Sequence, residues 1–277
     1  MRPSDVMKLL VGMIKAGLPA LLTGAPGIGK CLGKGTPILM FDGTIKPVEQ
    51  IVVGDSLIGP DSRPRKVLSL GNGIDMLFRV MPTKGDSYVV NSQHILSLRY
   101  SRRRKTHKYL TLNISVSDFL KNSNTFRHHA KGWRTGVEFP QTKIDMNPYI
   151  LGLWLGDGDN DRAAFTNIDP EIIEALVSFA PTVGLVARFW KVATRAKAKH
   201  IGLVRPRRNS RIGPNIITKA LIKYGLRDNE KFIPRDYLVN SREVRLAILA
   251  GLIDTDGSLI SNCYEIAQKS ERLAKDI

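Results

Sequence analysis

Apolar residues follow two different patterns along this chain, short alternating runs first and longer helical runs afterwards. From residue 37 to residue 98, short apolar segments are separated by turns rich in Gly, Pro and Asp, which is typical of an all-β unit. After about residue 143, the apolar runs 148–156 and 242–253 have helical length and spacing. The pattern therefore predicts a β-rich unit followed by an α/β unit, and 277 residues are enough for two domains.

Individual residues mark where some elements begin. Asp169, Pro170 and Glu171 form a good helix start, with a capping side chain, a proline at the first helical position and an acid in the first turn. Residues 1–30 predict an amphipathic helix, an apolar strand over 19–23 and a glycine-rich loop.

That loop fits a phosphate-binding pattern but ends in an unexpected residue. Gly24, Gly29 and Lys30 occupy the defining positions of G-x-x-x-x-G-K, whose backbone N–H groups and lysine bind nucleotide phosphates. The next residue should be Ser or Thr at the start of a helix, but it is Cys31, followed by residues that do not begin a helix. We interpret this as an interruption, with a second element beginning at Cys31.

The strong positive charge predicts a nucleic-acid partner. The chain has 42 Lys and Arg against 25 acids, a net charge of +17, and residues 175–227 contain twelve Lys and Arg but no acid. Such stretches suit a phosphate backbone, although a single basic run is more often a solubilising surface. The candidate phosphate contacts are Arg102, Arg103, Arg104, Lys191, Arg195, Lys197 and Lys199.

Cysteine content and hydropathy indicate the compartment. Two cysteines do not suggest a disulfide framework, and we expect Cys263 to be a small buried side chain. No signal peptide or membrane span is visible, so we expect a cytoplasmic protein without a membrane partner.

One long-period repeat has candidate chemistry. Residues 150–158 and 249–257 each form an apolar run that ends in Asp-Gly, with Asp157 and Asp256 at matching places 99 residues apart. Gly152, Ala250 and Gly251 would let two helices pack closely, and the final glycine of each copy would form a left-handed turn. Two carboxylates at the helix ends could bind Mg²⁺ for phosphodiester hydrolysis. Alternatively, each pair merely ends a buried helix.

The second copy closely resembles the motif that names the LAGLIDADG homing endonucleases, and the first copy is a looser match. The resemblance implies an α/β endonuclease domain that cuts a double-stranded DNA homing site, with Asp157 and Asp256 as catalytic metal ligands. Mg²⁺ is the implied cofactor.

A second resemblance starts at Cys31. Together with residues 35–39, 53–55 and 91–94, Cys31 resembles the opening blocks of inteins, the self-splicing elements of the horseshoe-shaped, β-rich Hint fold. Residues 31–64 particularly resemble the large, endonuclease-bearing kind found in the yeast vacuolar ATPase. The resemblance implies that Cys31 attacks the carbonyl of Lys30 to form a thioester and that His94 protonates or distorts this peptide bond. Asn91 replaces the usual threonine, and splicing needs no cofactor.

The two resemblances predict three segments. Residues 1–30 resemble the start of AAA-type ATPases of the MoxR kind and would be the N-extein, 31–142 part of a Hint domain, and 143–277 a LAGLIDADG domain with a partial second repeat. Splicing would supply the missing Ser or Thr of the phosphate-binding loop. Because no terminal His-Asn pair is present, we expect an N-terminal intein fragment, split or truncated, whose partner is a C-terminal intein fragment with its C-extein.

Three alternatives stay open. The chain could be a free-standing LAGLIDADG endonuclease with an unrelated β-domain, or a non-catalytic DNA-binding protein of the maturase type. A working ATPase is the weakest, because the loop hydroxyl is missing.

Overall fold

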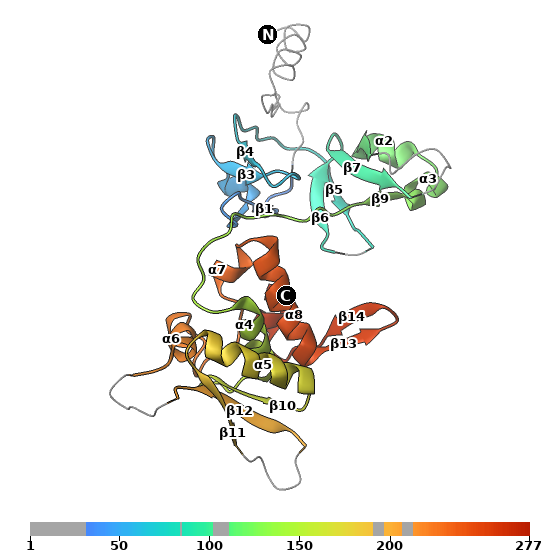
Figure 1. Cartoon of the computed structure of the whole chain (residues 1–277). Helices are drawn as coiled ribbons and strands as arrows, with labels where there is room; N and C mark the ends of the chain where they lie inside the picture. Colours follow the sequence, from blue (N-terminus) through green and yellow to red (C-terminus); the bar gives the residue numbers. More distant parts are fainter. Residues whose placement is uncertain (1–31, 84, 102–110, 191–196, 207–212) are drawn as a thin grey trace. The chain divides into compact units, whose positions relative to one another are not determined.

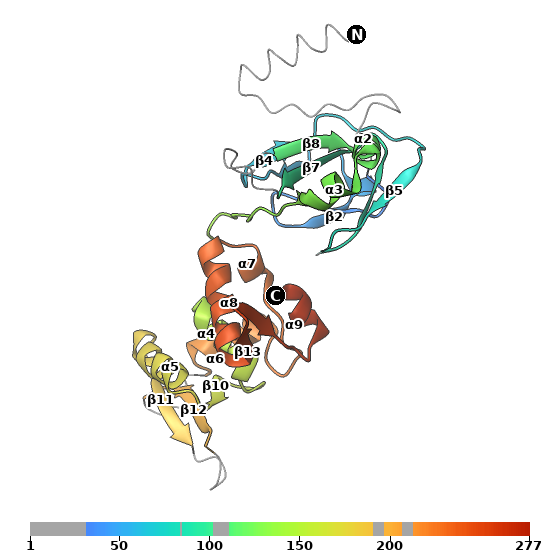
Figure 2. The same ribbon diagram turned by 90° about the vertical axis from the view of Figure 1, so that its right-hand side faces the viewer.

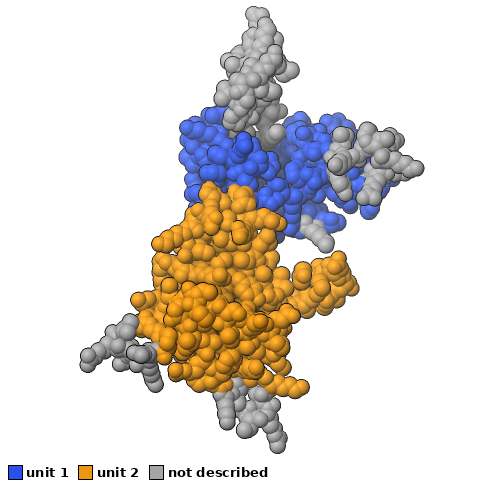
Figure 3. Space-filling model, in the orientation of Figure 1, with its two compact units in different colours: residues 1–137 blue, residues 138–277 orange. Residues whose placement is uncertain are grey.

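The structure is a computed structural model that describes residues 32–83, 85–101, 111–190, 197–206 and 213–277. The chain divides into two compact units at the boundary between Val137 and Glu138 (Figure 3). Each unit is described by itself. The mixed fold predicted from the sequence, with a β-rich first part and an α/β second part, is confirmed.

The first unit consists of small antiparallel sheets (Figure 1). Three are two-stranded, pairing β1 with β2, β3 with β4 and β5 with β6, and the fourth has the order β8-β7-β9. The elements are β1 (Pro37–Leu39), β2 (Ile45–Pro47), η1 (Val48–Gln50), β3 (Ser56–Ile58), β4 (Pro64–Lys66), β5 (Leu77–Val80), β6 (Tyr88–Asn91), β7 (Ile95–Tyr100), β8 (Thr111–Ser115), α2 (Val116–Lys121), α3 (Asn124–His129) and β9 (Ala130–Gly132).

Two small cores hold these hairpins together. Met40, Ile51 and Val67 form one cluster. The other is centred on Val90, which is fully buried, and includes Leu96 from β7. Because each core is small, the first unit depends on backbone pairing between neighbouring strands as much as on apolar burial.

The described part of the second unit contains three helices of ten or more residues, a three-stranded sheet and a separate hairpin (Figure 2). Its sheet has the order β10-β12-β11, and α5 packs on β11 and β12. The elements are α4 (Pro148–Asp157), β10 (Ala164–Asn167), α5 (Pro170–Thr182), β11 (Val186–Trp190), β12 (Lys199–Val204), α6 (Ile216–Lys223), α7 (Arg235–Leu238), α8 (Arg242–Asp256), β13 (Gly257–Ile260), β14 (Cys263–Ile266) and α9 (Glu271–Asp276).

Helices α4 and α8, which carry the two copies of the repeat, pack directly on each other. A Cβ atom on Gly152 would lie 3.0 Å from the Cα of Gly251, and one on Gly251 would lie 2.9 Å from the Cα of Gly152. Glycine at both positions therefore permits backbone-to-backbone contact at the crossing. Ala250, which we also expected at this contact, is exposed.

Capping side chains fix where these helices begin. The side chain of Asn147 accepts hydrogen bonds from two backbone N–H groups at the start of α4, and Ser241 accepts one at the start of α8. The predicted start of α5 is confirmed, since the Asp169 side chain accepts from the N–H of Glu171.

Two expectations about single residues are wrong. Gly158 and Gly257 do not form left-handed turns, because their φ angles are −80° and −90° in extended backbone. Glycine is needed at these positions because there is no room for a side chain. A Cβ on Gly257 would lie 2.5 Å from the Ile253 carbonyl oxygen, and one on Gly158 would collide with Trp154. Cys263 is exposed on β14 rather than buried, because its hairpin packs few side chains around it.

Candidate functional site

Asp157 and Asp256 are the last residues of α4 and α8, so the helix crossing determines where their carboxylates lie. A Cβ on Gly156 would lie 3.2 Å from Oδ2 of Asp256, which places the end of α4 beside that carboxylate. Gly156 would also collide with Thr255 if it had a side chain. Small residues along the crossing thus bring the two carboxylates into one site.

Each carboxylate accepts a hydrogen bond from a side-chain amide of its own repeat. Nδ2 of Asn167 donates to Oδ2 of Asp157 at 2.5 Å, and Nε2 of Gln268 donates to Oδ2 of Asp256 at 2.6 Å. Asn167 ends β10, and Gln268 follows β14. The matching amide contacts extend the repeat beyond the helices, to the end of β10 after α4 and to the residues after β14 that follow α8.

The electrostatics of the site favour a cation. Burial raises the pKa of Asp157, and the nearby negative charge of Asp256 raises it further, although the Asn167 amide and the charge of Lys231 act in the opposite direction. When a partly desolvated carboxylate lies beside a second one, a cation that binds to both of them stabilises their negative charges.

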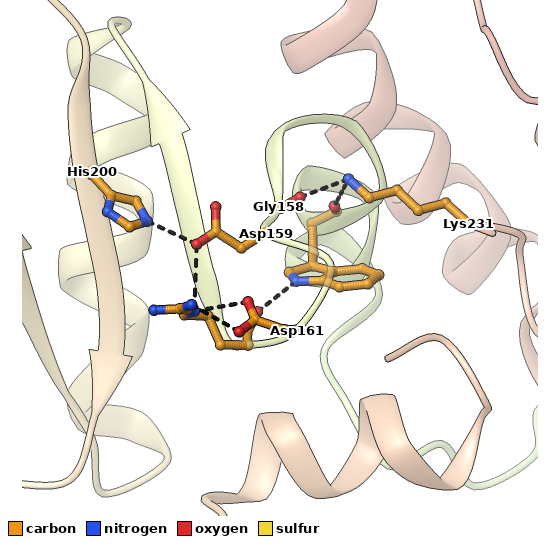
Figure 4. A network of polar contacts seen from close by, with 7 residues as sticks. Gly158, Asp159, Asp161, His200 and Lys231 are labelled. Atoms are coloured by element: carbon orange, nitrogen blue, oxygen red, sulfur yellow. Dashed lines mark hydrogen bonds and ion pairs between the residues drawn. The ribbon is translucent and has the colours of Figure 1, made fainter. Parts of the chain in front are cut away.

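Lys231 was not identified from the sequence, and it supports the end of α4. Its Nζ donates to the carbonyl oxygens of Trp154 at 3.0 Å and Gly158 at 2.8 Å (Figure 4). It also donates to the carbonyl oxygen of Gly156 at 3.1 Å and lies 5.1 Å from the centre of the Trp154 ring. Burial lowers the pKa of Lys231, while the charges of Asp256 and Asp157 oppose this shift. The ammonium group thereby supplies an N–H donor to three carbonyls at the end of α4, of which that of Trp154 also accepts the Gly158 N–H at 2.9 Å.

The loop after α4 is attached to the sheet by a polar network. Nε2 of His200, on β12, lies 2.9 Å from Oδ2 of Asp159, and Arg162 pairs with Asp161 at 2.7 Å (Figure 4). The Trp154 indole N–H donates to the carbonyl of Arg162 at 2.9 Å. These contacts connect the residues after Asp157 to the sheet and to the core.

The basic stretch runs through the three-stranded sheet. Lys197 and Lys199 are exposed, and Nζ of Lys199 lies 5.9 Å from the centre of the Phe189 ring. The other predicted phosphate contacts, Arg102, Arg103, Arg104, Lys191 and Arg195, lie outside the described residues. No helix in the described part of the chain is both long and apolar enough to cross a membrane.

A second candidate site lies in the first unit, around Asn91 and His94. Asn91 ends β6 and is 1% exposed, and its backbone carbonyl accepts the N–H of His94 at 3.2 Å. The His94 carbonyl accepts the N–H of Val116 at 3.0 Å, so the turn is fixed on both sides. One carboxylate there was not identified from the sequence: Oδ2 of Asp75 accepts from Nδ2 of Asn91 at 3.1 Å.

The first described residues of the chain lie against the same strand. Leu32 forms an antiparallel bridge with Val90, and the N–H of Gly33 donates to the Val89 carbonyl at 2.7 Å. A Cβ on Gly33 would lie 2.8 Å from the Val89 side chain, so glycine permits this approach. Cys31 itself and the loop residues Gly24, Gly29 and Lys30 lie outside the described residues.

Comparison with known proteins now defines the class of the first unit. Residues 31–131 match the family described as "Hom_end-associated Hint", so the chain has a Hint domain of the kind associated with homing endonucleases.

Three relatives extend this result. The chain is 25% identical over 279 aligned residues to the replicative DNA helicase DnaB of Mycobacterium intracellulare, covering 93% of this chain and 43% of the helicase. It is 34% identical over 125 residues to the homothallic switching endonuclease of Saccharomyces cerevisiae (40% of this chain, 21% of that protein). It is 26% identical over 120 residues to the catalytic subunit of the V-type proton ATPase of Candida tropicalis (42% and 11%). The chain thus spans less than half the length of each of these relatives.

Proposed function

We propose that the second unit cleaves phosphodiester bonds of double-stranded DNA at a specific site, with Asp157 and Asp256 as the metal-binding carboxylates. The observation that carries this proposal is the helix crossing, which brings two carboxylates from a repeated motif into one site. Similarity to a homothallic switching endonuclease supports a DNA substrate.

The residues present fit a hard divalent cation such as Mg²⁺. Within the described residues there is no cluster of three or more His, Cys, Asp or Glu side chains that could hold a metal ion. The protein therefore offers two carboxylates, and oxygen atoms of the DNA and water would complete the coordination. When bound there, Mg²⁺ would activate a water molecule and stabilise the leaving oxygen.

Two neighbouring amide side chains hold the carboxylates of Asp157 and Asp256 in place. Asn167 and Gln268 fix one oxygen of each carboxylate, so the remaining oxygen lone pairs are presented in a constant direction. Exposed Lys197 and Lys199 supply positive charge for the phosphate backbone. The basic residues that lie outside the described ranges, Arg102, Arg103, Arg104, Lys191 and Arg195, remain part of this proposal.

The test is cleavage of a plasmid that carries the uninterrupted coding sequence of the phosphate-binding loop, assayed with Mg²⁺ and with EDTA. Asp157→Asn and Asp256→Asn should each abolish cleavage while a gel-shift assay still detects binding. Asp236→Asn is the matched control, because Asp236 is an exposed aspartate of α7 in the same unit, and this variant should cut DNA normally. Binding without metal-dependent cutting by the wild type would favour the non-catalytic DNA-binding alternative.

We propose a second activity for the first unit, an N-to-S acyl shift at the Lys30–Cys31 peptide bond. It is favoured by the Hint match, which begins at Cys31, and by the position of Leu32 beside the strand that ends at Asn91. The Cys31 thiolate would attack the Lys30 carbonyl carbon. The C–N bond would break, a thioester would form, and the nitrogen would leave as the free amino group of Cys31 after protonation through His94.

The acyl shift is tested by the intact mass of the purified chain after incubation with dithiothreitol. The thiol should release residues 1–30 from the wild type, whereas Cys31→Ala should stay intact. If both stay intact, the chain has no acyl-shift activity and the free-standing endonuclease becomes the better explanation. Nucleotide binding that Lys30→Ala removes would instead support the ATPase alternative.

A further inference from the structure

Asp75 holds the side chain of Asn91 from the segment that precedes β5. Its Oδ2 accepts the Asn91 Nδ2–H at 3.1 Å, and its Oδ1 accepts the N–H of Met76 at 2.7 Å. Both oxygens of the carboxylate are therefore fixed. Leu77 is paired with Asn91 in the β5–β6 ladder, which fixes the distance between the two backbones.

The chemistry of this contact determines the orientation of the amide. An ionised carboxylate only accepts hydrogen bonds, whereas an asparagine side chain has a donor end and an acceptor end. Asp75 therefore keeps the NH₂ group of Asn91 turned toward itself and the carbonyl oxygen turned away. Without such a partner, the amide could exchange its two ends by rotation.

Apolar packing does not explain why this segment lies against Asn91. The two neighbours of Asp75 in the sequence, Ile74 and Met76, are 105% and 72% exposed. Asn91, in contrast, is 1% exposed. The polar contact of Asp75 therefore adds to the β5–β6 backbone pairing in holding this segment against the buried end of β6.

We propose that Asp75 is a positioning residue for the acyl shift and acts by fixing the orientation of the Asn91 side chain. This inference rests on the second activity proposed above. Leu32 pairs with Val90, the residue directly before Asn91, so the amide lies on the strand that pairs with the first described residue after the Lys30–Cys31 bond. A fixed amide presents the same hydrogen-bonding end in every molecule, which lowers the entropy cost of reaching the reactive geometry.

The experiment measures the rate at which dithiothreitol releases residues 1–30 from the full chain. Asp75→Ala should slow release about tenfold, the effect of losing one hydrogen bond to a charged group. Asp75→Asn keeps an acceptor for Nδ2 but also presents a donor, so it should slow release less than Asp75→Ala does. Asp61→Ala is the control, since Asp61 is another acid of the same unit, paired with Arg65, and should release at the wild-type rate.

A double-mutant cycle separates positioning from general destabilisation. If Asp75 acts through Asn91, then Asp75→Ala should slow release no further in an Asn91→Ala background. The Asn91 side-chain NH₂ signals in ¹H–¹⁵N spectra give a readout that does not need the reaction, and they should shift and exchange faster with water in Asp75→Ala.

The outcomes are distinct. Equal rates for wild type and Asp75→Ala, or additive effects of Asp75→Ala and Asn91→Ala, overturn the positioning role while leaving the acyl shift intact. Unchanged Asn91 amide signals in Asp75→Ala overturn it even if the rate falls, because the carboxylate then does not hold the amide. If the wild type releases nothing, the acyl shift itself fails, and a role for Asp75 in that reaction fails with it.

Discussion

The close backbone contact between α4 and α8 makes a strong prediction about stability. In Gly251→Ala, the new methyl group would lie 2.7 Å from the Leu153 nitrogen and 2.9 Å from the Gly152 Cα, and it would collide with the Tyr149 carbonyl. All three neighbours are backbone atoms of α4, so no side chain can rotate away. The helices must separate.

Two opposing effects set the magnitude. Replacing glycine by alanine inside a helix normally stabilises it by about 1 kcal/mol. Overpacking a buried contact costs about 1–3 kcal/mol, and we expect the upper end because backbone atoms are involved. The net loss in the free energy of unfolding should therefore be about 2 kcal/mol, and the melting temperature of the unit should fall by several degrees.

Urea denaturation followed by circular dichroism measures this change, and the same variant should lose metal-dependent DNA cleavage because Asp157 and Asp256 move apart. Gly132→Ala is the matched control, since a Cβ there has no neighbour within 4 Å. An unchanged or increased free energy of unfolding for Gly251→Ala would refute the idea that glycine is needed at this crossing.

Three further predictions follow from single contacts. Lys231→Met keeps the apolar stem but removes the ammonium donor from three carbonyls, of which only that of Trp154 keeps the Gly158 N–H, so the free energy of unfolding should fall by about 1–3 kcal/mol, whereas the exposed control Lys275→Met should change little. Lys199→Ala should reduce the slope of log affinity for DNA against log salt by about 0.9 in titrations, and an unchanged slope would mean that Lys199 contacts no phosphate. Hydrogen bonds from Lys223 and Tyr224 lower the pKa of Asp145, so its stabilisation is present above the ordinary aspartate pKa of about 4 and is lost as pH falls below it. Asp145→Asn should therefore show a weaker loss of stability than the wild type when acid unfolding is followed.

Local signals in the sequence were sufficient for α4, α5 and α8 and for much of the β-rich unit. The start of α5 was predicted because an N-cap, a proline and an acid stand next to one another. The α4 and α8 helices were predicted because their apolar runs have helical length and spacing.

The partners of the site residues could not be predicted in the same way. Lys231 contacts carbonyls more than seventy residues earlier in the chain, and in the sequence it is one charge among several polar neighbours. Asn167 had a weak signal, since it stands two residues before the cap of α5, but only the folded strand shows that it faces Asp157. The conformations of Gly158 and Gly257 were misjudged because the motif indicates where glycine is needed and not whether conformation or space requires it.

The way in which Lys231 is used explains how the site can remain negative although a buried cation lies close by. An ammonium group has three N–H donors, and in Lys231 three carbonyl oxygens of the α4 end accept them. The lysine therefore neutralises the helix terminus, and its charge acts on Asp157 and Asp256 only through space. If Nζ formed an ion pair with one of the carboxylates, it would occupy one carboxylate oxygen and neutralise part of the negative charge that attracts a cation. Because the carbonyls hold Nζ, both carboxylates keep oxygen atoms for the metal ion that we propose, and the same three hydrogen bonds hold the end of α4 that carries Asp157.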